Sequence, residues 1–262
     1  LFCVVSGRVQ PKLKKRGEVE RYSSCERSGE IKTHKVRFVR SPMKRDFDDL
    51  ELAEKTLAEK WDHFERHDLI PTEHIPPGHK TGDEGGAGSG TDKPLKLGTE
   101  KWFQMFTPRQ LLGHLTLMDA LREMKPRIIA ELGEDRGRAV ITYLQFAIDK
   151  GVDYNSRQTR WIYQRGQVSG TFGRHDFSFK WTFGEMVFSG PNSGAAWGLS
   201  QILDAYSGIA ELLKDAPKDT RLSIINGSGA KMDQVTDASV DLVVNDPPYY
   251  NNVMYSELAD YF

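Results

Sequence analysis

Apolar side chains recur at helical spacing along much of the chain, and such stretches predict amphipathic helices. The first begins near Asp46, where several acidic residues suit the positive end of a helix dipole. Its inward face is formed by Leu50, Ala53, Leu57, Trp61 and Phe64. Two later stretches, 134–150 and 196–214, have the same pattern and are also expected to be helical. The inward positions expected for 134–150 are Ala139, Tyr143, Leu144 and Ala147.

Another predicted helix has a well-marked beginning. Thr107 is expected to be the N-cap, Pro108 the first helical residue, and Gln110 the partner that completes a capping box. The buried stripe that follows comprises Leu111, Leu115, Met118 and Leu121. The local pattern therefore predicts where this helix starts as well as which face it buries.

Strand-like patterns occur in other parts of the chain. Residues 222–226 and 240–245 are short apolar runs separated by a turn and polar material, which favours a parallel α/β sheet. Residues 160–190 are strand-like and rich in aromatic side chains. These aromatic side chains either pack in the core or form a platform on which bases stack. Near the amino end, Val36, Phe38 and Val39 are expected to be extended.

These patterns divide the chain into four expected parts. Residues 1–45 form a small β-rich appendage, and 46–81 hold a helix followed by an extended, proline-containing loop. Residues 82–98 read as a flexible glycine-rich linker, whose glycines lack the spacing of a phosphate-binding loop. Residues 99–262 form the main α/β domain.

Composition narrows the class of protein. Hydrophobic residues make up 38% and charged residues 28%, as in a soluble globular protein, and no apolar run reaches the roughly 18 residues of a membrane span. Two cysteines are too few for a disulfide framework, which fits a reducing cytoplasm. The net charge of −1 gives no global signal for nucleic acid. Local basic runs, at 12–16 and 35–45, are either a phosphate-binding patch or a solvated face.

The motif with the clearest chemistry is Asp246-Pro247-Pro248-Tyr249, at the carboxyl end of the apolar run 240–245. Open α/β sheets bind ligands at this end of their strands, and consecutive prolines make a rigid turn with fixed carbonyl directions. Asp246 and the carbonyl of Pro247 would accept hydrogen bonds from an exocyclic base amine. Tyr249 would stack on a base flipped out of the duplex. The alternative interpretation is a stiff turn with no chemistry.

The segment 241–260, DLVVNDPPYYNNVMYSELAD, resembles the catalytic motif of amino-methyltransferases. More narrowly, it is similar to the large adenine-specific DNA methylases that carry a zinc ribbon. Further segments resemble that family: AEKW (58–61), LIPTE (69–73), FTPRQLL (106–112), DYNSR (153–157) and TFGR (171–174). The resemblance covers most of residues 50–262.

The resemblance implies a Rossmann-like methyltransferase fold, S-adenosylmethionine as methyl donor and N6 of adenine in DNA as acceptor. It implies that Asp246, Pro247, Pro248 and Tyr249 form the catalytic loop. Phe106, Thr107 and Pro108 resemble the motif that contacts the methionine part of the cofactor, although a plain helix cap explains Thr107 and Pro108 equally well.

Two departures from the family pattern matter. Its glycine-rich cofactor loop is absent, and the nearest candidate, 131–137, lies between predicted helices. The zinc-ribbon ligands are also missing, because Cys3 and Cys25 are isolated and His34 is too distant for a standard pair. No metal is therefore expected. The chain looks like an internal fragment with an incomplete methyltransferase fold, whose parent is the enzyme and which alone is expected to be inactive.

Two alternatives remain open at this point. The same loop suits any exocyclic amine, so cytosine N4 in DNA or adenine in RNA are alternative acceptors. A different class, a nucleic-acid-binding module without activity, would use the basic amino-terminal segment and the aromatic stretch. The amino-acid sequence indicates neither the DNA sequence that would be recognised nor the oligomeric state.

Overall fold

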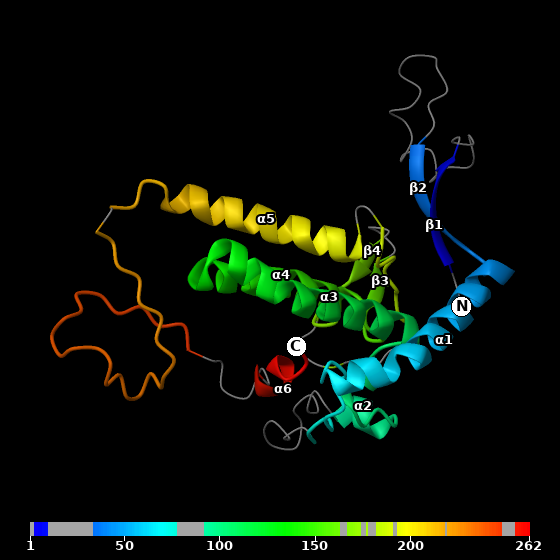
Figure 1. Ribbon diagram of the computed structural model, residues 1–262, viewed down its shortest axis with the longest axis horizontal. Helices are drawn as coiled ribbons and strands as arrows, with labels where there is room; N and C mark the ends of the chain where they lie inside the picture. Colours follow the sequence, from blue (N-terminus) through cyan, green and yellow to red (C-terminus); the bar gives the residue numbers. More distant parts are fainter. Residues whose placement is uncertain are drawn as a thin grey trace, which may run out of the picture.

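The computed structural model describes residues 3–9, 34–77, 92–162, 167–173, 177, 182–190, 193–217, 219–247 and 255–262. Its framework is a set of four long helices, α1 (Lys44–Arg66), α3 (Pro108–Leu132), α4 (Glu134–Tyr154) and α5 (Gly194–Leu213). Helix α3 packs against α1 on one side and α4 on the other, and α4 in turn packs against α5 (Figure 1). Helix α3 therefore joins the two ends of the bundle.

The long helices lie where the apolar spacing predicts them, with small shifts at their ends. Helix α1 begins at Lys44 because the backbone N–H of Met43 donates to the Asp46 carboxylate at 2.7 Å. The helix buries Ala53, Leu57 and Phe64. Helix α4 continues to Tyr154, beyond the expected end at residue 150.

One inward position predicted for α4 is wrong. Ala139 is exposed, whereas Gly137 and Ala147 are buried. The contact with α3 is made at Gly137, where an added Cβ would lie 2.9 Å from the Cα of Ile129. Ala139 lies two residues further along, roughly 200° around the helix, and so faces solvent.

Two hydrophobic cores flank the start of α3. The first lies between α1 and α3 and comprises Leu57, Phe64, Leu69, Ile70, Leu111 and Leu115. The second core gathers residues that are distant in sequence. Trp102 and Met105 come from the short 3₁₀ helix η2 (Trp102–Met105), and they pack with Ile75, Phe177 and Tyr261. Tyr261 lies two residues after the end of the short helix α6 (Tyr255–Ala259), so this core holds the end of the described chain.

The described strands form two small antiparallel ladders. Strand β1 (Cys3–Val9) pairs with β2 (His34–Arg40), with Val5 opposite Phe38, and β2 contains the segment expected to be extended. Strands β3 (Arg160–Ile162) and β4 (Gln167–Ser169) form the other ladder, within the aromatic-rich stretch. Cys25 and the basic run 12–16 lie outside the described residues.

The expected linker 82–98 contains regular structure at its carboxyl end. Helix α2 (Asp92–Lys96) forms there, and Pro94 is buried. The carbonyl of Pro94 accepts hydrogen bonds from the N–H groups of Leu97 and Thr99, which closes the turn after the helix. The glycine-rich part, 82–91, lies outside the described residues.

The apolar runs 222–226 and 240–245 are not strands in this structure. Both are irregular, and Ile224 and Val244 are 89% and 84% exposed. They belong to a segment that extends from the end of α5 away from the helices (Figure 1). A strand of a parallel sheet pairs with at least one neighbouring strand, and within the described ranges neither run has a partner strand. The Rossmann-like fold expected from the sequence therefore stays a prediction.

Within the described parts of the chain, none of the helices combines the length and the apolar character that crossing a bilayer requires.

Two glycines of α5 provide a test of the packing between α4 and α5. A Cβ at Gly198 would lie 2.5 Å from the backbone oxygen of Ala147, whereas one at Gly208 would meet nothing within 4 Å. We expect Gly198→Ala to lower the free energy of unfolding by roughly 1–3 kcal/mol through overpacking. We expect Gly208→Ala to raise it by about 0.5–1 kcal/mol, the gain in helix propensity. Urea unfolding measures both, and equal effects of the two substitutions would contradict the close contact.

Candidate functional site

The amino end of α3 has the reciprocal capping box that the sequence predicts. The Thr107 hydroxyl accepts from the backbone N–H of Gln110 at 3.2 Å, and the Gln110 side-chain oxygen accepts from the N–H of Thr107 at 2.9 Å. Phe106 and Thr107 are half-buried, and Pro108 is exposed. The three residues expected to contact a cofactor thus lie together where the chain enters α3.

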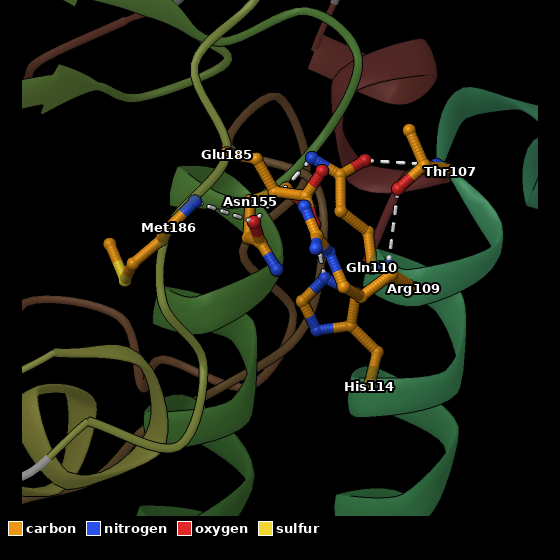
Figure 2. A network of polar contacts seen from close by, with 7 residues as sticks. All are labelled: Thr107, Arg109, Gln110, His114, Asn155, Glu185 and Met186. Atoms are coloured by element: carbon orange, nitrogen blue, oxygen red, sulfur yellow. Dashed lines mark hydrogen bonds and ion pairs between the residues drawn. The ribbon is translucent and has the colours of Figure 1, made fainter. Parts of the chain in front are cut away.

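Gln110 also reaches the far end of α4. Its side chain is fully buried, and its amide NH₂ group donates to the side-chain oxygen of Asn155 at 3.4 Å. The same Asn155 oxygen accepts from the backbone N–H of Met186 at 3.1 Å. Figure 2 shows how this network joins α3, the residue after α4 and the segment 182–190.

His114 lies one helical turn beyond Gln110 and is 3% exposed. Its Nε2 lies 3.0 Å from the carbonyl oxygen of Asn155, which assigns the ring proton to Nε2 as the donor. Burial lowers the pKa of His114 to about 4, against the smaller opposing effect of this hydrogen bond, so the ring is neutral at pH 7. The rings of Phe106 and Phe188 meet it edge-on, at centroid distances of 5.2 and 5.1 Å.

Segment 153–157 also contacts the described part of segment 171–174, which is residues 171–173. The carbonyl of Asp153 accepts from both the N–H and the hydroxyl of Thr171 at 2.7 Å, and the hydroxyls of Thr171 and Ser156 are 2.7 Å apart. Burial raises the pKa of the Asp153 carboxyl group, and hydrogen bonds from Phe172 and Thr171 together with the charge of Lys150 oppose that shift. A Cβ at position 170 would lie 2.7 Å from the Asp153 carboxylate, so the close approach requires Gly170.

Tyr261 connects these segments to the end of the chain. Its ring stacks on that of Phe106, with centroids 5.7 Å apart and planes at 28°. Its hydroxyl donates to the carbonyl of Val152 at 3.3 Å, and burial raises its pKa. We call Phe106, Gln110, Asn155, Thr171 and Tyr261 the motif cluster, because they come from four separate parts of the chain, three of them quoted motifs, and meet in one place.

Sequence reasoning missed several members of this arrangement. Gln110 was expected only as the capping partner of Thr107. His114 gave a signal, since a polar side chain there interrupts the apolar stripe of Leu111 and Leu115. Glu185 gave none, although its carboxylate forms an ion pair with the guanidinium of Arg109 beside the network (Figure 2).

The expected catalytic residues are only partly described. Asp246 and Pro247 are exposed on an irregular segment, and Pro248 and Tyr249 lie outside the described residues. Among the described residues, no hydrogen bond or ion pair joins Asp246 to the motif cluster. A cavity of about 320 Å³ between α3 and α4 is lined by other residues: Lys125, Ile129, Arg138, Ile141 and Thr142.

A scan against protein-family models and searches of curated proteins and of solved structures found no match to this chain. Function is therefore inferred from the motifs and from the contacts among them.

Asn155 provides a test of the buried network. Asn155→Ala removes the acceptor of the buried Gln110 amide and of the half-buried Met186 N–H, and we expect a loss of roughly 2–4 kcal/mol in the free energy of unfolding. Gln145→Ala is the matched control, because Gln145 is half-buried on α4 and its hydrogen bond among the described residues is local, to Asp149 at 2.8 Å. Urea unfolding followed by tryptophan fluorescence compares the two. Similar losses in both variants would contradict a special role for Asn155.

His114 predicts how stability depends on pH. The unfolded chain protonates this histidine below its ordinary pKa of 6.5, whereas the folded protein does so only near 4. The folded state therefore loses stability as pH falls from 6.5 towards 4, by at most about 3 kcal/mol from this group. The raised pKa of Asp153 acts in the opposite direction at the acid end.

The test measures the free energy of unfolding from pH 7 to pH 4.5. His114→Gln is expected to flatten the loss on acidification, because the titrating ring is gone while a donor for the Asn155 carbonyl remains. His74→Gln, at an exposed histidine, is the control and should keep the slope of the unchanged protein. An unchanged slope in His114→Gln would show that another group dominates.

Proposed function

We propose that this chain is part of an S-adenosylmethionine-dependent DNA methyltransferase that methylates an exocyclic base amine, N6 of adenine. The observation that carries the proposal is the run 240–245 leading into Asp246-Pro247-Pro248-Tyr249. An acidic residue, two prolines and an aromatic residue in this order supply two fixed acceptors and a stacking surface in one short loop. The proposed location is the cytoplasm, because a chain with two cysteines fits a reducing compartment.

Support from the fold comes from the contact between Phe106 and Tyr261. Helix α6 begins six residues after Tyr249, and the turn that follows it packs on Phe106 through Tyr261. Six residues span at most about 20 Å when fully extended. Chain length therefore keeps Tyr249 within about 20 Å of the start of α6, the helix whose following turn carries Tyr261.

The amino end of α3 fits the methionine part of the cofactor in two respects. Pro108 is exposed, and Phe106 and Thr107 are half-buried, so this edge is accessible to a ligand. The amino end of a helix also favours an anionic group, such as the carboxylate of a methionine moiety. S-adenosylmethionine would supply an electrophilic methyl group there.

The residues of the loop would act by positioning. Asp246 and the Pro247 carbonyl would accept the two N–H groups of the flipped adenine, which directs the nitrogen lone pair towards the methyl carbon. Tyr249 would stack on the base and hold its plane. The nitrogen bonds to the methyl carbon as the carbon–sulfur bond breaks, and the nitrogen then releases a proton to water. No covalent enzyme intermediate is required.

The test is transfer of a labelled methyl group to duplex DNA by the full-length protein that carries these residues. Asp246→Ala should lower the rate by roughly 10²–10³-fold, as expected for loss of one positioned electrostatic contact in a transition state. Cofactor binding, measured by calorimetry, should be unchanged. Asp241→Ala is the matched control, because it is an exposed aspartate in the same segment, and it should keep full activity.

The same experiment separates the alternatives. Methylated cytosine without methylated adenine would replace N6 by N4 as the acceptor, and transfer only to RNA would change the substrate class. A protein that binds DNA with a steep salt dependence, yet binds no S-adenosylmethionine, would be a nucleic-acid-binding module instead. Full activity of Asp246→Ala would remove the loop from the mechanism.

A further inference from the structure

A cluster of metal-ligating side chains lies between α1 and α3, separate from the motif cluster. His63 and His67 are four residues apart at the end of α1, so both project from one side of the helix. Asp119 projects from α3, and its carboxylate lies 2.7 Å from Nε2 of His63. One ligand atom from each of the three residues lies within 4.8 Å of the others.

The hydrogen bond between His63 and Asp119 leaves this cluster only partly satisfied. Nδ1 of His67 and the second carboxylate oxygen of Asp119 are both buried and have no hydrogen-bond partner. Buried polar atoms without partners are costly, and each one in a native protein requires an explanation. A simple ion pair between His63 and Asp119 explains neither atom, whereas a cation bound by all three side chains explains both.

The distances suit a small cation after modest side-chain movement. Nitrogen and oxygen ligands of tetrahedral zinc lie about 2.0–2.2 Å from the metal, and so roughly 3.3 Å from one another. The present separations, from 2.7 Å to at most 4.8 Å, bracket that value. The rings of His63 and His67 are already close, with centroids 4.3 Å apart.

One neighbouring charge opposes a cation here. The guanidinium of Arg122 lies 3.7 Å from the Asp119 oxygen that has no hydrogen bond, which is an ion-pair distance but too long for a hydrogen bond. Its side chain is 41% exposed, so it can turn towards water when a metal binds. The other side of His63 is closed by the ring of Phe64, edge-on at 5.6 Å.

We propose that His63, His67 and Asp119 form a binding site for a divalent transition-metal ion, with Zn²⁺ as the best match. Two imidazoles and one carboxylate are a borderline-soft ligand set that favours zinc over magnesium or calcium. A water molecule would complete the tetrahedron. The ion would clamp the end of α1 to the middle of α3. The site is independent of the proposed methyl transfer, and it departs from the expectation that the chain binds no metal.

The experiment titrates chelator-treated protein with Zn²⁺ against a chromophoric zinc indicator. We expect His67→Gln and Asp119→Asn each to remove one equivalent of bound zinc, or to weaken its binding by more than about tenfold. His74→Gln changes an exposed histidine outside the cluster and should leave the stoichiometry unchanged. Asp119→Asn keeps an acceptor for His63, which guards against simple misfolding, and circular dichroism checks that each variant is folded.

Two further measurements address the geometry and the clamp. Co²⁺ in place of Zn²⁺ should give the strong visible absorption of a tetrahedral site, and both cluster variants should lose that absorption. Zn²⁺ should raise the Tm of the unchanged protein and of His74→Gln, but not of the cluster variants. Equal zinc stoichiometry and affinity in the unchanged protein and in His67→Gln would overturn the proposal, as would cobalt spectra that the substitutions leave unchanged.

Discussion

The hydrogen bond between the buried side chains of Gln110 and Asn155 is the constraint on which the rest of the arrangement depends. A buried amide needs hydrogen-bond partners for its donors and its acceptor. Without them, the cost of desolvating these groups lowers the stability of the fold. Gln110 meets this demand by capping its own helix and by bonding to the residue after α4. The amino end of α3 and the carboxyl end of α4 are therefore held in one relative position.

The fixed position of α3 against α4 determines which other segments lie beside Asn155. The carbonyl of Asn155 accepts a hydrogen bond from His114, and its side-chain oxygen accepts one from the N–H of Met186, so a single residue orders three segments. The adjoining residues, Ser156 and Asp153, bond to Thr171. Phe106, half-buried beside this framework, stacks on Tyr261. Residues from separate motifs become neighbours because each link satisfies a buried polar group or an aromatic face.

Local features were predictable from the sequence, and features that need a distant partner were not. The capping box of Thr107 and Gln110 was expected because both partners lie within one helical turn. The exposure of Ala139 was not, because it depends on where α3 crosses α4 at Gly137. The site divides in the same way: the histidine spacing of His63 and His67 is visible in the sequence, but Asp119 joins them only through the packing of α1 on α3. The runs 222–226 and 240–245 are apolar, yet strand formation also needs partner strands, and the described residues supply none for them.

Helix α3 carries both clusters, which limits how they can influence each other. Thr107 and Asp119 are twelve residues apart, or about 18 Å along the helix axis. A cation at Asp119 is too distant to polarise a group bound at the amino end of α3, since the first core and its side chains lie between them. Its effect on the motif cluster would be mechanical, by fixing α1 against the shared helix. The two proposals therefore rest on different contacts of one helix, and either can hold without the other.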